Sequence, residues 1–200
     1  MQRILFERRT VPALRIDDEK VQGSTEIMWR LDELVPEPRL FPVDPRELAR
    51  VQEAERWGND VLQPVGRELV CAGMLDQPSA MVSYSEHSRI PPPAPVIRTV
   101  APAIAHMGAR INRTDAVVAR RDLQALPGQL DQIDAWIAEG RIGDAEHPNA
   151  ADLQIAATVR LLLTLADARP LIESRPIESL ARTLFPLADG EMPAGALPAL

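Results

Sequence analysis

The sequence predicts a small α/β unit followed by an all-α domain, so that the protein is mainly helical overall. Two short strand-like runs precede an abrupt helix start near residue 24. Beyond residue 44, apolar residues recur at the three- and four-residue spacing of buried helix faces. A proline-rich stretch separates the two parts. We therefore expect an α/β unit over 1–35, a linker over 36–43, a helical domain over 44–185 and a flexible tail over 186–200.

The first unit is organised around residues 10–27, which read as strand, tight turn, strand and helix. Pro12 stands at the mouth of the first strand, where a ladder N–H is not required and a cis peptide bond is tolerated. Ser24 stands at the expected helix N-cap, where free N–H groups and the helix dipole favour a carboxylate or a phosphate. The pattern predicts a main-chain edge for a peptide and a socket for its carboxylate. The following helix should bury Ile27, Leu31 and Leu34.

The helical domain opens with a clear helix start. Asp44 is the expected N-cap, Pro45 suits the first helical position, and Glu47 would complete a capping box. Apolar residues follow on one face as far as about residue 72, and Pro64 predicts a kink within it. We expect Trp57 to be a core or interface anchor rather than a stacking platform, because the sequence places no other aromatic residue near it.

The middle of the chain alternates helices with proline-rich breaks. Residues 75–95 hold five prolines and several serines, which predicts a loop. A helix is expected over 96–111 with an interruption at Pro102. Two further helical stretches, 115–126 and 129–139, should be separated at Pro127–Gly128.

A second capping box is expected where Asn149 and Asp152 open a new helix. The helix over 153–167 is apolar on nearly all sides, which is typical of a helix buried at the centre of a domain. A short helix over 177–185 should complete the fold before the tail, which is rich in Ala, Gly and Pro.

Composition narrows the class of protein. The net charge is −7, with 46% hydrophobic and 26% charged residues, which fits a soluble globular protein and argues against a nucleic-acid partner. Lys20 is the only lysine, and no basic cluster accompanies the arginines. The single cysteine, Cys71, fits a reducing compartment such as the cytoplasm. The sequence shows neither a secretory signal nor a membrane span, so we expect no membrane partner.

The Val11-Pro12 strand followed by the turn at Ser24 resembles the glutathione-binding half of the glutathione S-transferase family. In that family the Val-Pro peptide is cis and pairs with the cysteinyl part of glutathione, while the serine holds the γ-glutamyl carboxylate. The resemblance therefore implies glutathione as co-substrate, bound by Val11, Pro12, Gln22, Gly23 and Ser24. Gly23 and Glu26 depart from the family pattern, which usually has Glu or Gln before the serine and a small residue two positions after it. The family's all-helical second domain also has a capped core helix like the one at residue 149.

The resemblance implies a partial thioredoxin-like domain, since only ten residues precede Val11 and the unit's first βαβ element takes roughly 30 residues. The family's thiol-activating Tyr, Ser or Cys lies in that element, so the catalytic residue is unknown and the chain is expected to be inactive as given. The implied function is conjugation of glutathione to a small electrophile by a homodimer. The alternative is a transferase-like binding or dimerisation module without catalysis.

Other candidate residues have structural interpretations. Asp152 is expected to be a buried capping carboxylate rather than a catalytic group. His87, His106 and His147 are scattered without partners at metal-ligand spacing, so we expect no metal. Cys71 is expected to be an inert thiol. Tyr84 is a hydroxyl that would replace the missing activator only if its surroundings supported that role.

Overall fold

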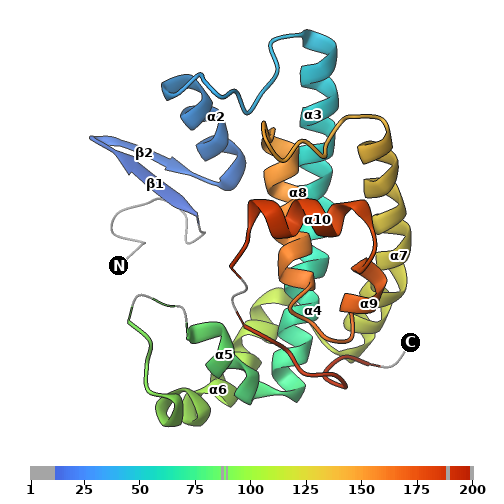
Figure 1. Ribbon diagram of the computed structural model, residues 1–200. Helices are drawn as coiled ribbons and strands as arrows, with labels where there is room; N and C mark the ends of the chain where they lie inside the picture. Colours follow the sequence, from blue (N-terminus) through green and yellow to red (C-terminus); the bar gives the residue numbers. More distant parts are fainter. Residues whose placement is uncertain (1–11, 87, 89, 188–189, 199–200) are drawn as a thin grey trace.

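The computed structural model describes residues 12–86, 88, 90–187 and 190–198 and is mainly helical, with one small sheet (Figure 1). The strands β1 (Ala13–Ile16) and β2 (Glu19–Gln22) form an antiparallel hairpin, and helix α2 (Ser24–Leu34) follows directly. This order agrees with the strand–turn–strand–helix pattern predicted for the first unit. The Val11–Pro12 peptide bond, expected to be cis, lies outside the described residues.

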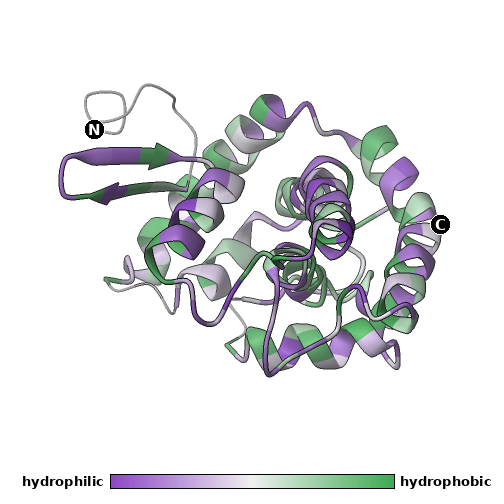
Figure 2. Ribbon diagram, turned by 90° about the horizontal axis from the view of Figure 1, so that it is seen from above, coloured by the Kyte–Doolittle hydropathy of each residue, from purple (hydrophilic) through white to green (hydrophobic). Residues whose placement is uncertain are grey.

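The hairpin projects from the side of a helical bundle (Figure 2). Leu14 pairs with Val21 across the ladder, and both are only half-buried. The predicted buried face of α2 is wrong: Leu31 and Leu34 are exposed, and Asp32 is buried instead. The reason is that α2 docks through its other side, where the ring of Trp29 stacks on Phe41 with 3.7 Å between centroids.

The predicted linker is fixed to both neighbouring elements. Asp32 Oδ1 accepts hydrogen bonds from the backbone N–H groups of Leu40 (2.5 Å) and Phe41 (3.4 Å). The carbonyl oxygen of Leu40 accepts one from Ala150 N, 2.9 Å away. The side chain of Phe41 is 3% exposed. The linker therefore connects α2 rigidly to the helical domain.

One long helical rod runs through the domain. Helix α3 (Pro45–Trp57) continues through the π-helical turn η1 (Gly58–Leu62) into α4 (Gln63–Asp76). The kink predicted at Pro64 thus takes the form of a wider turn just before the proline, which relieves the helical hydrogen bond that proline cannot donate. The rod carries Trp57, whose ring meets that of Trp136 edge-on at 5.1 Å. This partner lies 79 positions further on, and no local pattern indicates it.

The cap of α3 is formed only in part as predicted. Asp44 Oδ1 accepts from the N–H groups of Arg46 and Glu47, both at 3.0 Å, and Pro45 is the first helical residue. The Glu47 carboxylate does not complete the box, because it accepts from Arg50 Nη1 at 3.1 Å instead. An arginine three residues along the same face draws the carboxylate away from the helix start.

Helix α8 (Ala150–Leu162) lies at the centre, as its apolar sequence predicts. It packs on α3, α4 and α10 (Pro176–Leu184). Figure 2 views α8 and the α3–α4 rod end-on, with the other helices around them. Close approach between the rod and α8 depends on Gly66. A Cβ atom at that position would lie 2.9 Å from Thr158 Cγ2, nearer than real Cβ contacts allow.

The outer helices contain prolines that do not break them, contrary to the prediction from the sequence. Residues 75–95, predicted as a loop, include the 3₁₀ turn η2 (Pro78–Ala80) and helix α5 (Met81–Ser85). Helices α6 (Ala94–Asn112) and α7 (Ala116–Ala138) run unbroken through Pro102 and Pro127. A proline inside a helix costs about 3 kcal/mol. In α7 this cost is offset by a continuous buried face on both sides of the proline: Leu123, Leu126, Leu130 and Ile133.

Most of the described part of the predicted flexible tail, residues 190–198, packs against the bundle beyond the short helix α9 (Arg169–Ile172). Met192 is 1% exposed, and its N–H donates to Thr164 O at 2.8 Å. Asp167 accepts from the N–H groups of Gly195 and Leu197. Three apolar side chains, Met192, Ala196 and Leu197, are buried, and this burial holds the segment despite its Ala, Gly and Pro content.

Within the described residues, none of the helices has the length and apolarity needed to cross a membrane.

Candidate functional site

The turn between β2 and α2 holds the residues singled out by the sequence, with the helix start displaced by one position. Gly23, not Ser24, is the N-cap, and Ser24 is the first helical residue. Gly23 has φ 114°, a conformation that favours glycine, so the chain enters the helix there. Its N–H donates to the carbonyl oxygen of Pro12 at 3.1 Å. Gln22 pairs with Ala13 at the end of the ladder. Pro12, Gln22, Gly23 and Ser24 therefore lie together, and Val11 lies outside the described residues.

The N-terminus of α2 has no side-chain hydrogen bond from its N-cap residue. The carboxylate of Glu26 curls back instead, so that a Cβ atom at Gly23 would collide with Glu26 Oε2. An acidic group in the first turn is favoured by the positive end of the helix dipole. The chain thus places its own negative charge at the helix start where the sequence predicts a socket for a carboxylate.

The first turn of α2 is tied to the rod by a contact that sequence reasoning missed. Thr25 Oγ1 donates to Glu55 Oε1 at 2.6 Å, and Glu55 is 4% exposed. A short bond to a buried carboxylate fixes the orientation of the turn. The only available signal was a glutamate on the apolar face of α3, and its partner 30 residues away could not be identified from spacing.

The two side chains considered as thiol activators lie on other elements. Tyr84 is on α5, and its hydroxyl is 2.6 Å from Thr164 Oγ1. Cys71 is on α4, and Asn112 Nδ2 donates to its sulfur at 3.4 Å. Both elements occupy the lower half of Figure 1, whereas α2 is at the top. Burial raises the pKa of the Tyr84 hydroxyl and of the Cys71 thiol, so both groups favour their protonated, unreactive forms.

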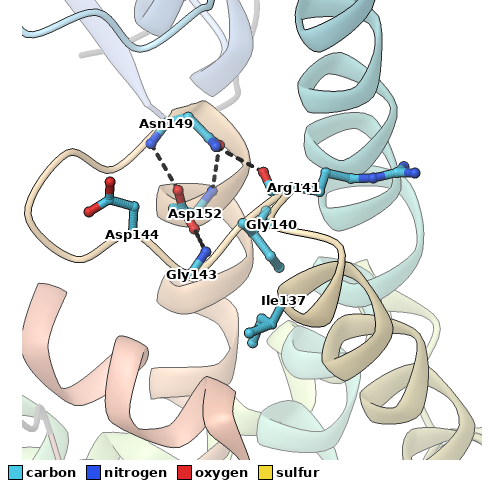
Figure 3. A pocket seen from close by; sticks show the side chains of 8 residues that line it. Ile137, Gly140, Arg141, Gly143, Asp144, Asn149 and Asp152 are labelled. Carbon is cyan, nitrogen blue, oxygen red and sulfur yellow. Dashed lines mark hydrogen bonds between the residues drawn. The ribbon is translucent and has the colours of Figure 1, made fainter.

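The capping box at the start of α8 is complete (Figure 3). Asn149 Oδ1 accepts from Ala151 N and Asp152 N, and Asp152 Oδ2 accepts from Asn149 N at 2.9 Å. Asp152 Oδ1 also accepts from Gly143 N at 2.6 Å, which ties the preceding loop to the helix. Burial raises the pKa of Asp152, and the two backbone bonds oppose that shift. Because both oxygens are engaged, the adjoining cavity of about 280 Å³ has a structural carboxylate, not a free one, in its wall.

A second cavity, of about 240 Å³, lies between α8 and the segment after α10. Arg160 Nε donates to Phe185 O at 2.8 Å, and Thr164, which bonds Tyr84, is at the same cavity. The walls are mostly apolar, which suits an uncharged organic group. They are formed by Ala157, Arg160, Leu161, Thr164, Phe185 and Leu187.

Two carboxyl groups meet where α4 packs on α7. Asp122 is buried, and its Oδ1 accepts from Arg121 Nε (2.9 Å) and Nη2 (2.7 Å). Glu68 accepts from Arg121 Nη2 at 3.2 Å. Burial, and next a hydrogen bond with Asp122, raise the pKa of Glu68. The ionised form of Glu68, beside a second carboxylate, therefore destabilises the folded protein relative to the protonated form.

We expect Glu68→Gln to stabilise the fold by about 1 kcal/mol at neutral pH, because its amide donates permanently to Asp122. The folded pKa of Glu68 lies above the unfolded one, so the parent loses stability as pH rises from the unfolded pKa through the folded one. Melting temperatures measured from pH 4 to pH 8 should show a gain that grows with pH. An equal gain at every pH would contradict the raised pKa of Glu68.

The described residues contain no group of three or more His, Cys, Asp or Glu side chains that could hold a metal ion. No protein-family model, curated protein or solved structure matches the chain.

Proposed function

We propose that the chain is a glutathione transferase-like protein that binds glutathione at the hairpin–α2 turn. The observation that supports this most directly is a strand leading into a helix N-terminus without a side-chain cap, with the backbone of Pro12 bonded beside it. Helix N–H groups of this kind favour a carboxylate such as that of the γ-glutamyl group. In this proposal the hairpin and α2 are part of a thioredoxin-like unit, and the homodimeric protein works in the cytoplasm.

The cavity between α8 and the segment after α10 is the proposed place for an apolar ligand of the non-catalytic alternative, because Thr164 in its wall bonds Tyr84 on α5, away from the hairpin–α2 turn. Its apolar walls would hold a small uncharged compound, and Thr164 offers the one hydroxyl among the wall residues. In the conjugation, the thiolate of glutathione would form a bond to the electrophilic carbon, and the leaving group would depart with its electron pair.

Binding without catalysis is the alternative, and the raised pKa values of Tyr84 and Cys71 favour it. A thiolate is stabilised by a donor beside it, and these two groups are held elsewhere in the bundle. We therefore expect the purified chain to conjugate glutathione with a generic aromatic electrophile no faster than the uncatalysed reaction. Turnover above that rate, lost in Tyr84→Phe or Cys71→Ser, would identify the activating group and overturn the hypothesis of binding without catalysis.

The Glu26 carboxylate provides a direct test of the proposed glutathione site. Replacing it with glutamine removes a negative charge from the helix N-terminus, so Glu26→Gln should bind glutathione about fivefold more tightly, by the size of a helix-end charge effect. Isothermal titration calorimetry at low salt measures the difference.

Asp18→Asn is the matched control, because it removes the same charge from the fully exposed tip of the hairpin. Its affinity for glutathione should equal that of the parent. Cysteinylglycine, which lacks the γ-glutamyl carboxylate, should gain nothing from Glu26→Gln. Absence of glutathione binding in both the parent and Glu26→Gln would overturn the proposed site.

A further inference from the structure

Three consecutive prolines precede helix α6 and restrict their own backbone. The ring of each one, Pro91, Pro92 and Pro93, locks φ at about −65°. A residue that stands before a proline is driven to an extended ψ of about +120 to +160°, and this applies to Ile90 and to the first two prolines. Pro93 has φ −57° and ψ 134°. The sequence therefore favours a polyproline II conformation over residues 90–93, which we call the proline segment.

Only the last residue of the proline segment has a role in the bundle. The carbonyl oxygen of Pro93 accepts from Val96 N at 2.9 Å and so begins α6. The two prolines before it are exposed, and no hydrogen bond joins them to another residue that the structure describes. Ile90 is 84% exposed, more than any other large apolar side chain in the described part of the chain. The start of α6 therefore does not explain why residues 90–92 are apolar and rigid.

The surroundings of the proline segment are open and basic. In Figure 1 the connection from α5 to α6 lies at the lower left, outside the central helices. Residues 87–114 contain four arginines and neither Asp nor Glu, in a protein with a net charge of −7. Arg98, in the second turn of α6, is exposed. A partner that approaches this end of the molecule should therefore carry acidic side chains around its binding site.

The chemistry of the proline segment narrows the kind of partner. Prolines have no backbone N–H, so Pro91 and Pro92 offer apolar rings and carbonyl acceptors but no donors. This excludes pairing with a strand at the edge of a sheet, which needs donors from both chains. Tyr and Trp side chains suit the segment, because each combines a flat apolar ring with an O–H or N–H donor.

We propose that the proline segment is a preformed ligand for a groove lined by Trp and Tyr rings on a partner protein. Such grooves bind the polyproline II helix, which loses little conformational entropy on binding because it is already ordered. The helix has three residues per turn, so Ile90 and Pro93 lie on the same side of it. Ile90 therefore adds an apolar contact at the first end of the ligand.

The test uses the full chain and three purified modules with aromatic-lined grooves, an SH3, a WW and an EVH1 domain. At least one isotopically labelled domain should bind the chain, with a shift of the N–H resonance of its groove Trp. Pro91→Gly/Pro92→Gly should weaken this binding about tenfold or more, because two glycines must lose backbone freedom that the prolines lack. Pro93 is kept so that α6 begins in place.

Pro36→Gly/Pro186→Gly is the matched control, because it replaces two exposed prolines outside the proline segment and should bind like the parent. Ile90→Asp should weaken binding about fivefold by loss of apolar contact. Leu187→Asp, at a residue that is 74% exposed elsewhere, should not. The proposal is overturned if none of the three domains binds the parent, if resonances shift only outside the groove, or if either Pro91→Gly/Pro92→Gly or Ile90→Asp binds like the parent.

Discussion

Asp152→Ala is expected to lower the free energy of unfolding by about 3 kcal/mol, more than loss of a cap alone, which costs about 1 kcal/mol. The carboxylate is 0% exposed and accepts from Gly143 N and Asn149 N. Its removal takes the carboxylate partner from two part-buried hydrogen bonds, which costs about 1–3 kcal/mol further. Urea unfolding at neutral pH measures the difference through the midpoint and the slope.

Asp44→Ala is the matched control for that experiment. Asp44 is also an N-cap that accepts from two backbone N–H groups, but it is exposed at the start of α3. Water replaces those bonds, so this substitution should cost about 1 kcal/mol. Equal midpoints for the two variants would show that burial of Asp152 adds nothing to its capping role.

Helix starts that depend on local contacts could be read from the sequence. Asn149 and Asp152 satisfy each other within four residues, and Asp44 caps α3 through N–H groups two and three positions on. The capping box at Glu47 is only half formed, and local spacing does not predict this. Arg50 competes for the carboxylate, and spacing alone did not decide which interaction would prevail.

Features set by long-range packing could not be predicted. The apolar spacing of α2 suggested that Leu31 would be buried, but the stacking of Trp29 on Phe41 turns that face outward. Pro127 suggested a break in α7, but burial on both sides of the proline keeps the helix intact. In each case tertiary contacts outweigh a local preference of a few kcal/mol.

The position of the candidate site could be predicted from the sequence, but the arrangement of its charged side chains could not. The sequence placed the turn at residues 22–24, and Glu26 departs from the family pattern. The N-cap is nevertheless Gly23, because this residue adopts a positive φ. The folding of the Glu26 side chain over Gly23 depends on rotamers. The bond from Thr25 to Glu55 depends on how α2 docks on α3, and so lies beyond local sequence reasoning.

Gly66→Val is expected to destabilise the protein by about 3 kcal/mol, near the upper end of overpacking effects. Helix propensity alone predicts the opposite, because glycine in a helix interior is about 1 kcal/mol worse than alanine. At Gly66 sterics should prevail, since a Cβ atom would lie 2.9 Å from Thr158 Cγ2 on the central helix α8.

Gly128→Ala is the control: Gly128 is within α7 with nothing within 4 Å of its Cβ position, so this variant should be more stable than the parent. Thermal unfolding of both variants decides between the two effects, and a stabilised Gly66→Val would show that the rod and α8 are packed more loosely than these distances indicate.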